Sequence, residues 1–143
     1  MSIVVADMHT IIWYLRDSSK LSAIAIASLD AAIAAGDCIY ISSISVVEIA
    51  YLVEKIRLPE AALNQLIEAL SDPNIGFAVV PLSLAIAQAI RQLPRDIVSD
   101  MPDRIIAATA LNLKLPLVTR DEKIRGFHLL KGGDILLIML IYI

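Results

Sequence analysis

Four acidic residues stand at places in the sequence from which they could hold a divalent cation together. Asp7 and Asp121 each come just after a short apolar run, Glu48 lies early in an apolar helical segment, and Asp103 lies in the first turn of another. Acids held close together repel one another, which raises their pKa values, and a hard cation relieves that repulsion. Oxygen ligands favour Mg²⁺ or Mn²⁺, and the chain has one cysteine, so a thiolate zinc cluster is excluded. Such a site suits metal-assisted hydrolysis of phosphodiesters.

Each acid also has a purely structural interpretation. Asp7 can cap the helix that follows it, and Glu48 fits a capping box with Ser45, whose amide it would bind. In "DMPDRIIAAT", Asp100 can be the N-cap and Asp103 a favourable acid in the first helical turn. Asp121 can cap the short helical turn that it begins, and His9 can be an ordinary polar residue at a helix start. Taken singly, these residues leave capping and metal binding open.

Short strands alternate with helices along the chain, and this order decides where the acids lie. Apolar and β-branched runs predict strands at 3–6, 38–42, 77–81 and 115–119. Helical periodicity and capping residues predict helices at 10–16, 22–36, 45–55, 59–72, 84–93 and 102–114, with a short helical turn at 121–126. This alternation predicts an α/β fold with a parallel sheet and helices on both faces. Ligands of such sheets bind beyond the carboxyl ends of the strands, where the four acids should converge.

Length, hydropathy and charge predict a single-domain protein with partners and argue against a membrane protein. The 143 residues suggest one domain, and 58% of them are hydrophobic, with a mean hydropathy of +0.75. That much apolar surface predicts a homodimer, a protein partner, or both. The longest uncharged apolar run, Ile135 to Ile143, is too short to span a membrane, and the N-terminal run lacks the basic region of a signal peptide. The lone Cys38 and the net charge of −3 favour a cytoplasmic protein without a broad basic surface.

Four segments in order resemble the PIN-domain ribonucleases, and among them the VapC-type toxins of prokaryotic toxin–antitoxin pairs. The segments are "VVADMHTIIWYL", "SSISVVEIAYLVEKIRL", "DMPDRIIAATAL" and "LPLVTRDEKI", and the resemblance covers residues 2 to 131. The chain departs from the family pattern at Met8, where relatives often have Ser or Thr, and Thr10 is the nearest hydroxyl.

The resemblance implies a three-layer α/β/α sandwich around a five-stranded parallel sheet with the order 3-2-1-4-5. It implies a PIN-like nuclease domain at 1–131, followed by an apolar segment, 132–143, that is either the final edge strand or an atypical tail. The resemblance also implies the catalytic and metal-binding residues, which are Asp7, Glu48, Asp103 and Asp121. Glu48 would bind the metal directly or through water. The implied auxiliary residues are Thr119 and Asp100.

The implied activity is that of a type II toxin. The enzyme would be an endoribonuclease that uses one or two Mg²⁺ or Mn²⁺ ions, cleaves RNA to a 5′-phosphate and a 3′-hydroxyl, and is blocked by a cognate antitoxin. Residues that could meet the substrate phosphates are Lys55, Arg57, Arg91 and Arg95.

Three other functions compete with this hypothesis. A PIN-fold scaffold would bind partners without nuclease activity, but it would not need all four acids. An aspartate-dependent phosphatase would have a second Asp two residues after the first, and position 9 is His. A phospho-accepting signalling module would have an acceptor Asp after the third strand, where the chain has Pro81, Leu82 and Ser83.

Overall fold

A computed structural model describes residues 3–96, 98–119, 130–131, 134–135 and 138–140. The strands are β1 (Val4–Ala6), β2 (Ile39–Ser42), β3 (Phe77–Val80), β4 (Leu117–Thr119), β5 (Leu130–Lys131), β6 (Asp134–Ile135) and β7 (Ile138–Leu140). The helices are α1 (Met8–Leu15), α2 (Ala23–Ala34), α3 (Ser43–Glu54), α4 (Glu60–Ser71), α5 (Leu84–Ala89), the 3₁₀ helix η1 (Ile90–Gln92) and α6 (Met101–Leu113). The short helical turn predicted at 121–126 lies outside the described residues.

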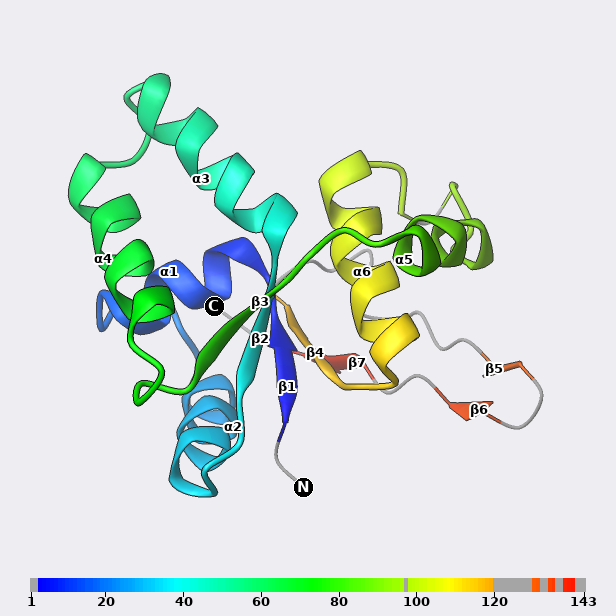
Figure 1. The fold of residues 1–143 in the computed structure, drawn as a ribbon, viewed down its shortest axis with the longest axis horizontal. Helices are drawn as coiled ribbons and strands as arrows, with labels where there is room; N and C mark the ends of the chain where they lie inside the picture. The colour runs from blue at the N-terminus through cyan, green and yellow to red at the C-terminus, as the bar shows by residue number, and fades with distance from the viewer. Residues whose placement is uncertain (1–2, 97, 120–129, 132–133, 136–137, 141–143) are drawn as a thin grey trace.

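The main sheet has five strands in the order β3-β2-β1-β4-β7, and all its pairs are parallel (Figure 1). This confirms the predicted order 3-2-1-4-5, in which β7 is the fifth strand. The segment 132–143 therefore contributes β7, whose Ile138 pairs with Leu117 of β4. A separate antiparallel pair, β5 and β6, stands apart from this sheet.

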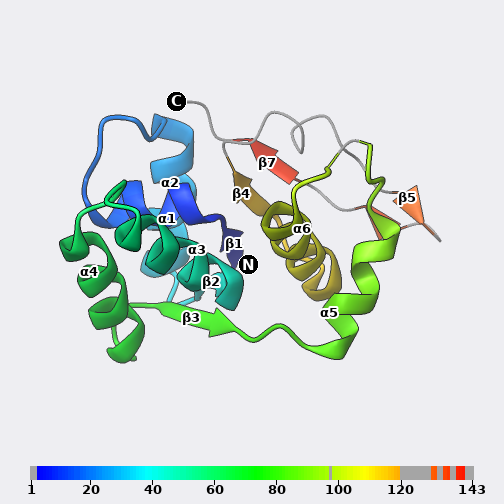
Figure 2. The same cartoon turned by 90° about the horizontal axis from the view of Figure 1, so that it is seen from above.

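Helices cover both faces of the sheet and make the predicted three-layer sandwich (Figure 2). Side chains alternate along each strand, so Val4 and Ala6 join the core shared with α1, α2 and α4. Val5 joins the opposite core, formed with α5 and α6. Because both faces of β1 are buried, its sequence is a continuous apolar run instead of an alternating one.

Several helix ends lie where their capping residues predict. Ser22 caps α2 by accepting from the Ala25 amide at 3.1 Å, and Gly36 has a φ of +73° just beyond the end of that helix. The segment 84–93 differs from the prediction, because α5 ends at Ala89 and continues as η1. None of the helices in the described part of the chain is long and apolar enough to cross a membrane.

Candidate active site

Asp7 lies at the carboxyl end of β1, where it begins α1. Its Oδ1 accepts from the Thr10 backbone N–H at 2.9 Å and from Thr10 Oγ1 at 2.6 Å, so the capping prediction is confirmed. Its Oδ2 accepts from Thr119 Oγ1, at the end of β4, at 2.5 Å. The carboxylate is only 8% exposed and is therefore held from both sides, by a helix and by a neighbouring strand.

The two threonines that hold Asp7 are themselves buried. Thr10 is 0% exposed, and its hydroxyl also lies 3.2 Å from the Val118 carbonyl of β4. Thr119 was predicted as an auxiliary hydroxyl, and the structure places that hydroxyl on the Asp7 carboxylate. Met8, where relatives often have Ser or Thr, is a buried core residue instead.

Glu48 does not form the predicted capping box. The helix begins two residues earlier than expected, at Ser43, because β2 runs straight into α3 and Ser42 caps it with a 3.3 Å bond from the Ile44 amide. Ser45 is therefore inside the helix, and Glu48 lies beyond the first turn, where free amides no longer occur. The capping-box interpretation of Glu48 is wrong, so its position needs another explanation.

The surroundings of Glu48 are unfavourable for an isolated carboxylate. Its Oε1 atom is buried and has no hydrogen-bond partner among the described residues. Burial, then the negative charges of Asp100 and Asp7, raise the pKa of Glu48 from 4.5 to about 7. Three acids from three different elements therefore share one electrostatic environment.

Asp100 caps α6, as predicted. Its Oδ2 accepts from the Asp103 amide at 3.3 Å, and Pro102 lies in the first turn of the helix. Asp100 is exposed, yet its charge is the larger of the two that act on Glu48. Asp103 is half-buried in the same turn, at the start of a stretch that buries every residue from Ile105 to Ala110. The fourth predicted acid, Asp121, lies outside the described residues.

The donor set suits a hard cation. An unpartnered buried carboxylate oxygen beside two further acids is what Mg²⁺ or Mn²⁺ would bind, and a cation would offset the repulsion that raises the pKa of Glu48. Within the described ranges, no three Asp, Glu, His or Cys side chains already lie close enough to form a metal site by themselves.

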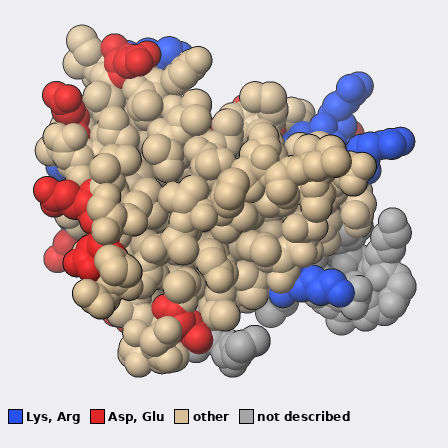
Figure 3. All heavy atoms as spheres, viewed as in Figure 1, with Lys and Arg blue, Asp and Glu red and all other residues tan. Residues whose placement is uncertain are grey.

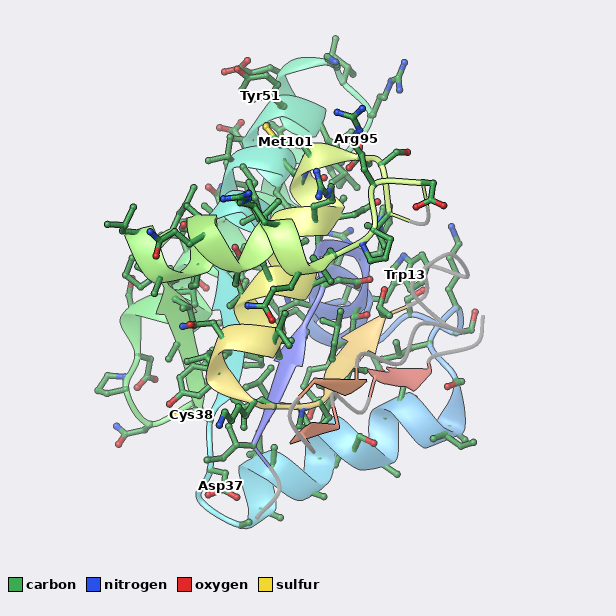
Figure 4. All side chains as sticks on the ribbon, turned by 90° about the vertical axis from the view of Figure 1, so that its right-hand side faces the viewer. Trp13, Asp37, Cys38, Tyr51, Arg95 and Met101 are labelled. Atoms are coloured by element: carbon green, nitrogen blue, oxygen red, sulfur yellow. The ribbon has the colours of Figure 1, made fainter. Side chains whose placement is uncertain are left out.

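The four basic residues predicted to meet substrate are all exposed. Lys55 and Arg57 lie in the turn after α3, and Arg91 and Arg95 lie in and after η1. Figure 3 shows basic side chains at the top and along the right of one face, with an indentation of the outline between them. In Figure 4, Tyr51 of α3, Met101 of α6 and Arg95 gather at one end of the molecule, opposite the residues before β2.

Two contacts near the site were not predicted. Arg104 follows Asp100 and Asp103 in the sequence, which would suggest an ion pair with one of them. Instead, its Nη2 donates to the backbone carbonyls of Ile90 and Leu93, at 3.1 and 3.0 Å. It thereby ties the end of η1 to α6. The rings of His9 and Trp13 contact each other at an angle of 53°, with centroids 5.5 Å apart, and Lys20 Nζ lies 5.8 Å from the centroid of the Trp13 ring. Neither contact leaves a periodic signal in the sequence.

Comparisons with known proteins show the family of this chain and agree with its fold. The model of the PIN domain family matches residues 4–128. The chain is 30% identical to the ribonuclease VapC22 of Mycobacterium tuberculosis over 131 residues, which are 88% of this chain and 92% of the relative. A toxin–antitoxin complex from Klebsiella pneumoniae is similar with a TM-score of 0.63, at 25% identity, over 87% of this chain and 92% of that one. The VapBC2 complex from Rickettsia felis, bound to a promoter DNA fragment, is similar with a TM-score of 0.64 at 19% identity. The match covers 86% of this chain and 91% of that one.

Proposed function

Because this chain belongs to the PIN-domain family and is a homologue of a VapC ribonuclease, we propose that it is a divalent-metal-dependent endoribonuclease and the toxin of a type II toxin–antitoxin pair. The observation that carries the proposal is the buried Oε1 of Glu48, which has no described partner and shares its surroundings with Asp7 and Asp100. A carboxylate kept in such a place is costly for the fold and useful for binding a cation.

The proposed catalytic and metal-binding acids are Asp7, Glu48, Asp103 and Asp121, with Asp100 and Thr119 as auxiliaries. When bound, one or two Mg²⁺ or Mn²⁺ ions would supply the positive charge that activates water and neutralises the phosphodiester. Asp7 would provide a fixed oxygen, because Thr10 and Thr119 hold its carboxylate from both sides. Glu48 would bind the ion or orient the attacking water.

The proposed substrate is RNA, held by basic side chains on two sides of the acids. Lys55 and Arg57 would bind phosphates on the α3 side, and Arg91 and Arg95 would do so on the η1 side. These positive charges offset the repulsion between the acid cluster and the RNA backbone.

The proposed partners are a cognate antitoxin and a second copy of the chain. Exposed apolar side chains lie around the acids, with Val47 at 48%, Tyr51 at 60% and Met101 at 64% exposure. An antitoxin could cover them while its arginine pairs with the acids. A separate uncharged area occupies the centre of the face in Figure 3. The exposed apolar residues of β3, of the connection after it and of the start of α5 are Val79, Leu82 and Leu84. They suit the homodimer, which light scattering would detect.

The direct test is cleavage of RNA by the purified protein with Mg²⁺ or Mn²⁺ and with chelator. Glu48→Gln keeps the side chain's size and removes its charge, so it should abolish cleavage. Glu54→Gln, on the exposed side of the same helix, is the matched control and should cleave as the wild type does. Cleavage that is indifferent to chelator, or retained by a folded Glu48→Gln protein, would contradict the proposal.

A further inference from the structure

The turn between α3 and α4 carries an isoleucine in an unfavourable backbone conformation. Ile56 has a φ of +58° and is 91% exposed. Two other non-glycine residues in the described part of the chain have positive φ, Asp17 and Lys114, and neither is β-branched. A β-branched side chain in the left-handed region is a genuine outlier, because its Cβ substituents crowd the backbone.

The turn needs the left-handed conformation, but it does not need isoleucine. The Ile56 amide donates to the Val53 carbonyl at 3.0 Å, and the Arg57 amide donates to the Leu52 carbonyl at 2.8 Å. This pattern closes the end of α3 in the way that usually employs glycine. Glycine would keep both bonds without strain and without an exposed apolar side chain. The fold therefore gives no reason for Ile56, and strain that the fold does not require points to function.

The neighbours of Ile56 indicate what it contacts. Lys55 and Arg57 are exposed on either side of it, while Glu54 is the last residue of α3. The tip formed by Lys55, Ile56 and Arg57 thus presents one apolar side chain between two cations. Cations suit phosphates, and apolar wedges such as isoleucine insert beside unstacked bases.

The tip also lies within reach of the acid cluster. Glu48 lies six residues before Glu54, the last residue of α3, which is about 9 Å along the helix axis, and the tip follows directly. Figure 1 shows this turn at the outer end of α3, which rises away from the carboxyl end of β2. An RNA strand bound at the acids and running along α3 would meet the tip.

We propose that the tip of residues 55–57 is an RNA contact in which Ile56 packs against an unstacked base while Lys55 and Arg57 bind the flanking phosphates. This proposal rests on the proposed ribonuclease function and adds a preference to it. Because a base in a duplex must first be unstacked before it can meet the wedge, whereas an unpaired base is already available, the tip favours single-stranded RNA over duplex.

The test uses Ile56→Asn and Ile56→Gly, since both residues adopt positive φ readily. Binding is measured with a fluorescently labelled single-stranded RNA and a matched duplex, in chelator so that no cleavage occurs. Each variant should bind the single strand about tenfold more weakly, as loss of one base contact would produce. Duplex affinity and melting temperature should not fall. Ile24→Asn removes another exposed isoleucine, on α2, and should bind as the wild type does.

Salt dependence separates the two parts of the tip. Lys55→Gln and Arg57→Gln should each flatten the dependence of affinity on salt, whereas Ile56→Asn should leave its slope unchanged.

Unchanged single-strand affinity in Ile56→Asn would overturn the proposal. If that variant instead weakened self-association, the tip would be a protein contact. A lower melting temperature in Ile56→Gly would show that Ile56 serves the fold. If chelator does not stop RNA cleavage by the wild type, or if the wild type does not cleave RNA, the proposed function is contradicted. If the wild type cleaves RNA but Ile56→Asn binds single-stranded RNA as tightly as the wild type does, only the proposed role of the tip is contradicted.

Discussion

Replacing Glu48 with glutamine should stabilise the metal-free protein at alkaline pH and leave it unchanged at acid pH. The pKa of Glu48 is raised from 4.5 to about 7, by burial and by the charges of Asp100 and Asp7. Folding therefore favours the neutral carboxyl group. Below 4.5 the group is protonated in both the folded and unfolded chains, so it costs nothing. The penalty grows as the pH rises from 4.5 to about 7 and is complete above that value.

The interval between 4.5 and about 7 sets the size of the effect. At about 1.36 kcal/mol per pH unit it corresponds to about 3.4 kcal/mol of unfolding free energy. Glu48 is only half-buried, so solvent screening reduces this to about 2 kcal/mol. For a chain of this length, such a difference corresponds to about 4–8 °C in melting temperature.

The assay is a set of thermal melts of wild type and Glu48→Gln in chelator, at pH values from about 4.5 to about 8. The two curves should meet at the acid end, with Glu48→Gln melting higher at the alkaline end. Glu54→Gln should follow the wild type. Added Mg²⁺ or Mn²⁺ at alkaline pH should raise the wild-type melting temperature more than that of Glu48→Gln. Parallel pH profiles for the two proteins would refute the electrostatic reasoning.

Three further substitutions or deletions test other parts of the structure. Thr10→Val removes a hydroxyl bond to buried Asp7 and should cost about 1–3 kcal/mol in denaturant unfolding and weaken Mn²⁺ binding in calorimetry, whereas Thr10→Ser should restore both. Asp100→Asn should not lower the melting temperature, because Asn caps as well as Asp, and it should lower the pKa of Glu48 in an NMR titration, which relieves part of the penalty at neutral pH. Ending the chain after Gly133 removes β7 and exposes the edge of β4, so solubility and melting temperature should both fall.

Most of the fold could be predicted because the elements are short, apolar and clearly separated. The strand that contains Val4 and Val5 is buried on both faces, and a continuous β-branched run signals that environment directly. Helix ends marked by a single capping residue, such as Ser22 and Asp100, were also predictable. The start of α3 was placed too late because Ser42 and Ser45 are equally plausible caps, and only the pairing of β2 decides between them.

The site could be predicted in part. A sequence shows that Asp7 follows a strand, but it does not show that Thr119, far along the chain, will bond to its carboxylate. Glu48 was assigned a local bond that the structure lacks, since capping is a local rule and its surroundings come from α6 and β1. Asp100 was predicted as a helix cap and, from the resemblance, as an auxiliary residue; the cap uses one oxygen, and the negative charge still acts on Glu48.

The bond between Thr119 and Asp7 also bears on when the protein becomes active. It joins residues 112 positions apart, and β1 lies at the centre of the sheet with β4 beside it. Contacts of such long sequence separation form late, and a chain still on the ribosome cannot make them before β4 has been synthesised. A nascent chain therefore carries Asp7 and Glu48 without the strand that completes their surroundings. Under the proposed function, a ribosome that has not yet synthesised β4 carries a chain in which Asp7 lacks its partner, so the site is assembled only after β4 has been made.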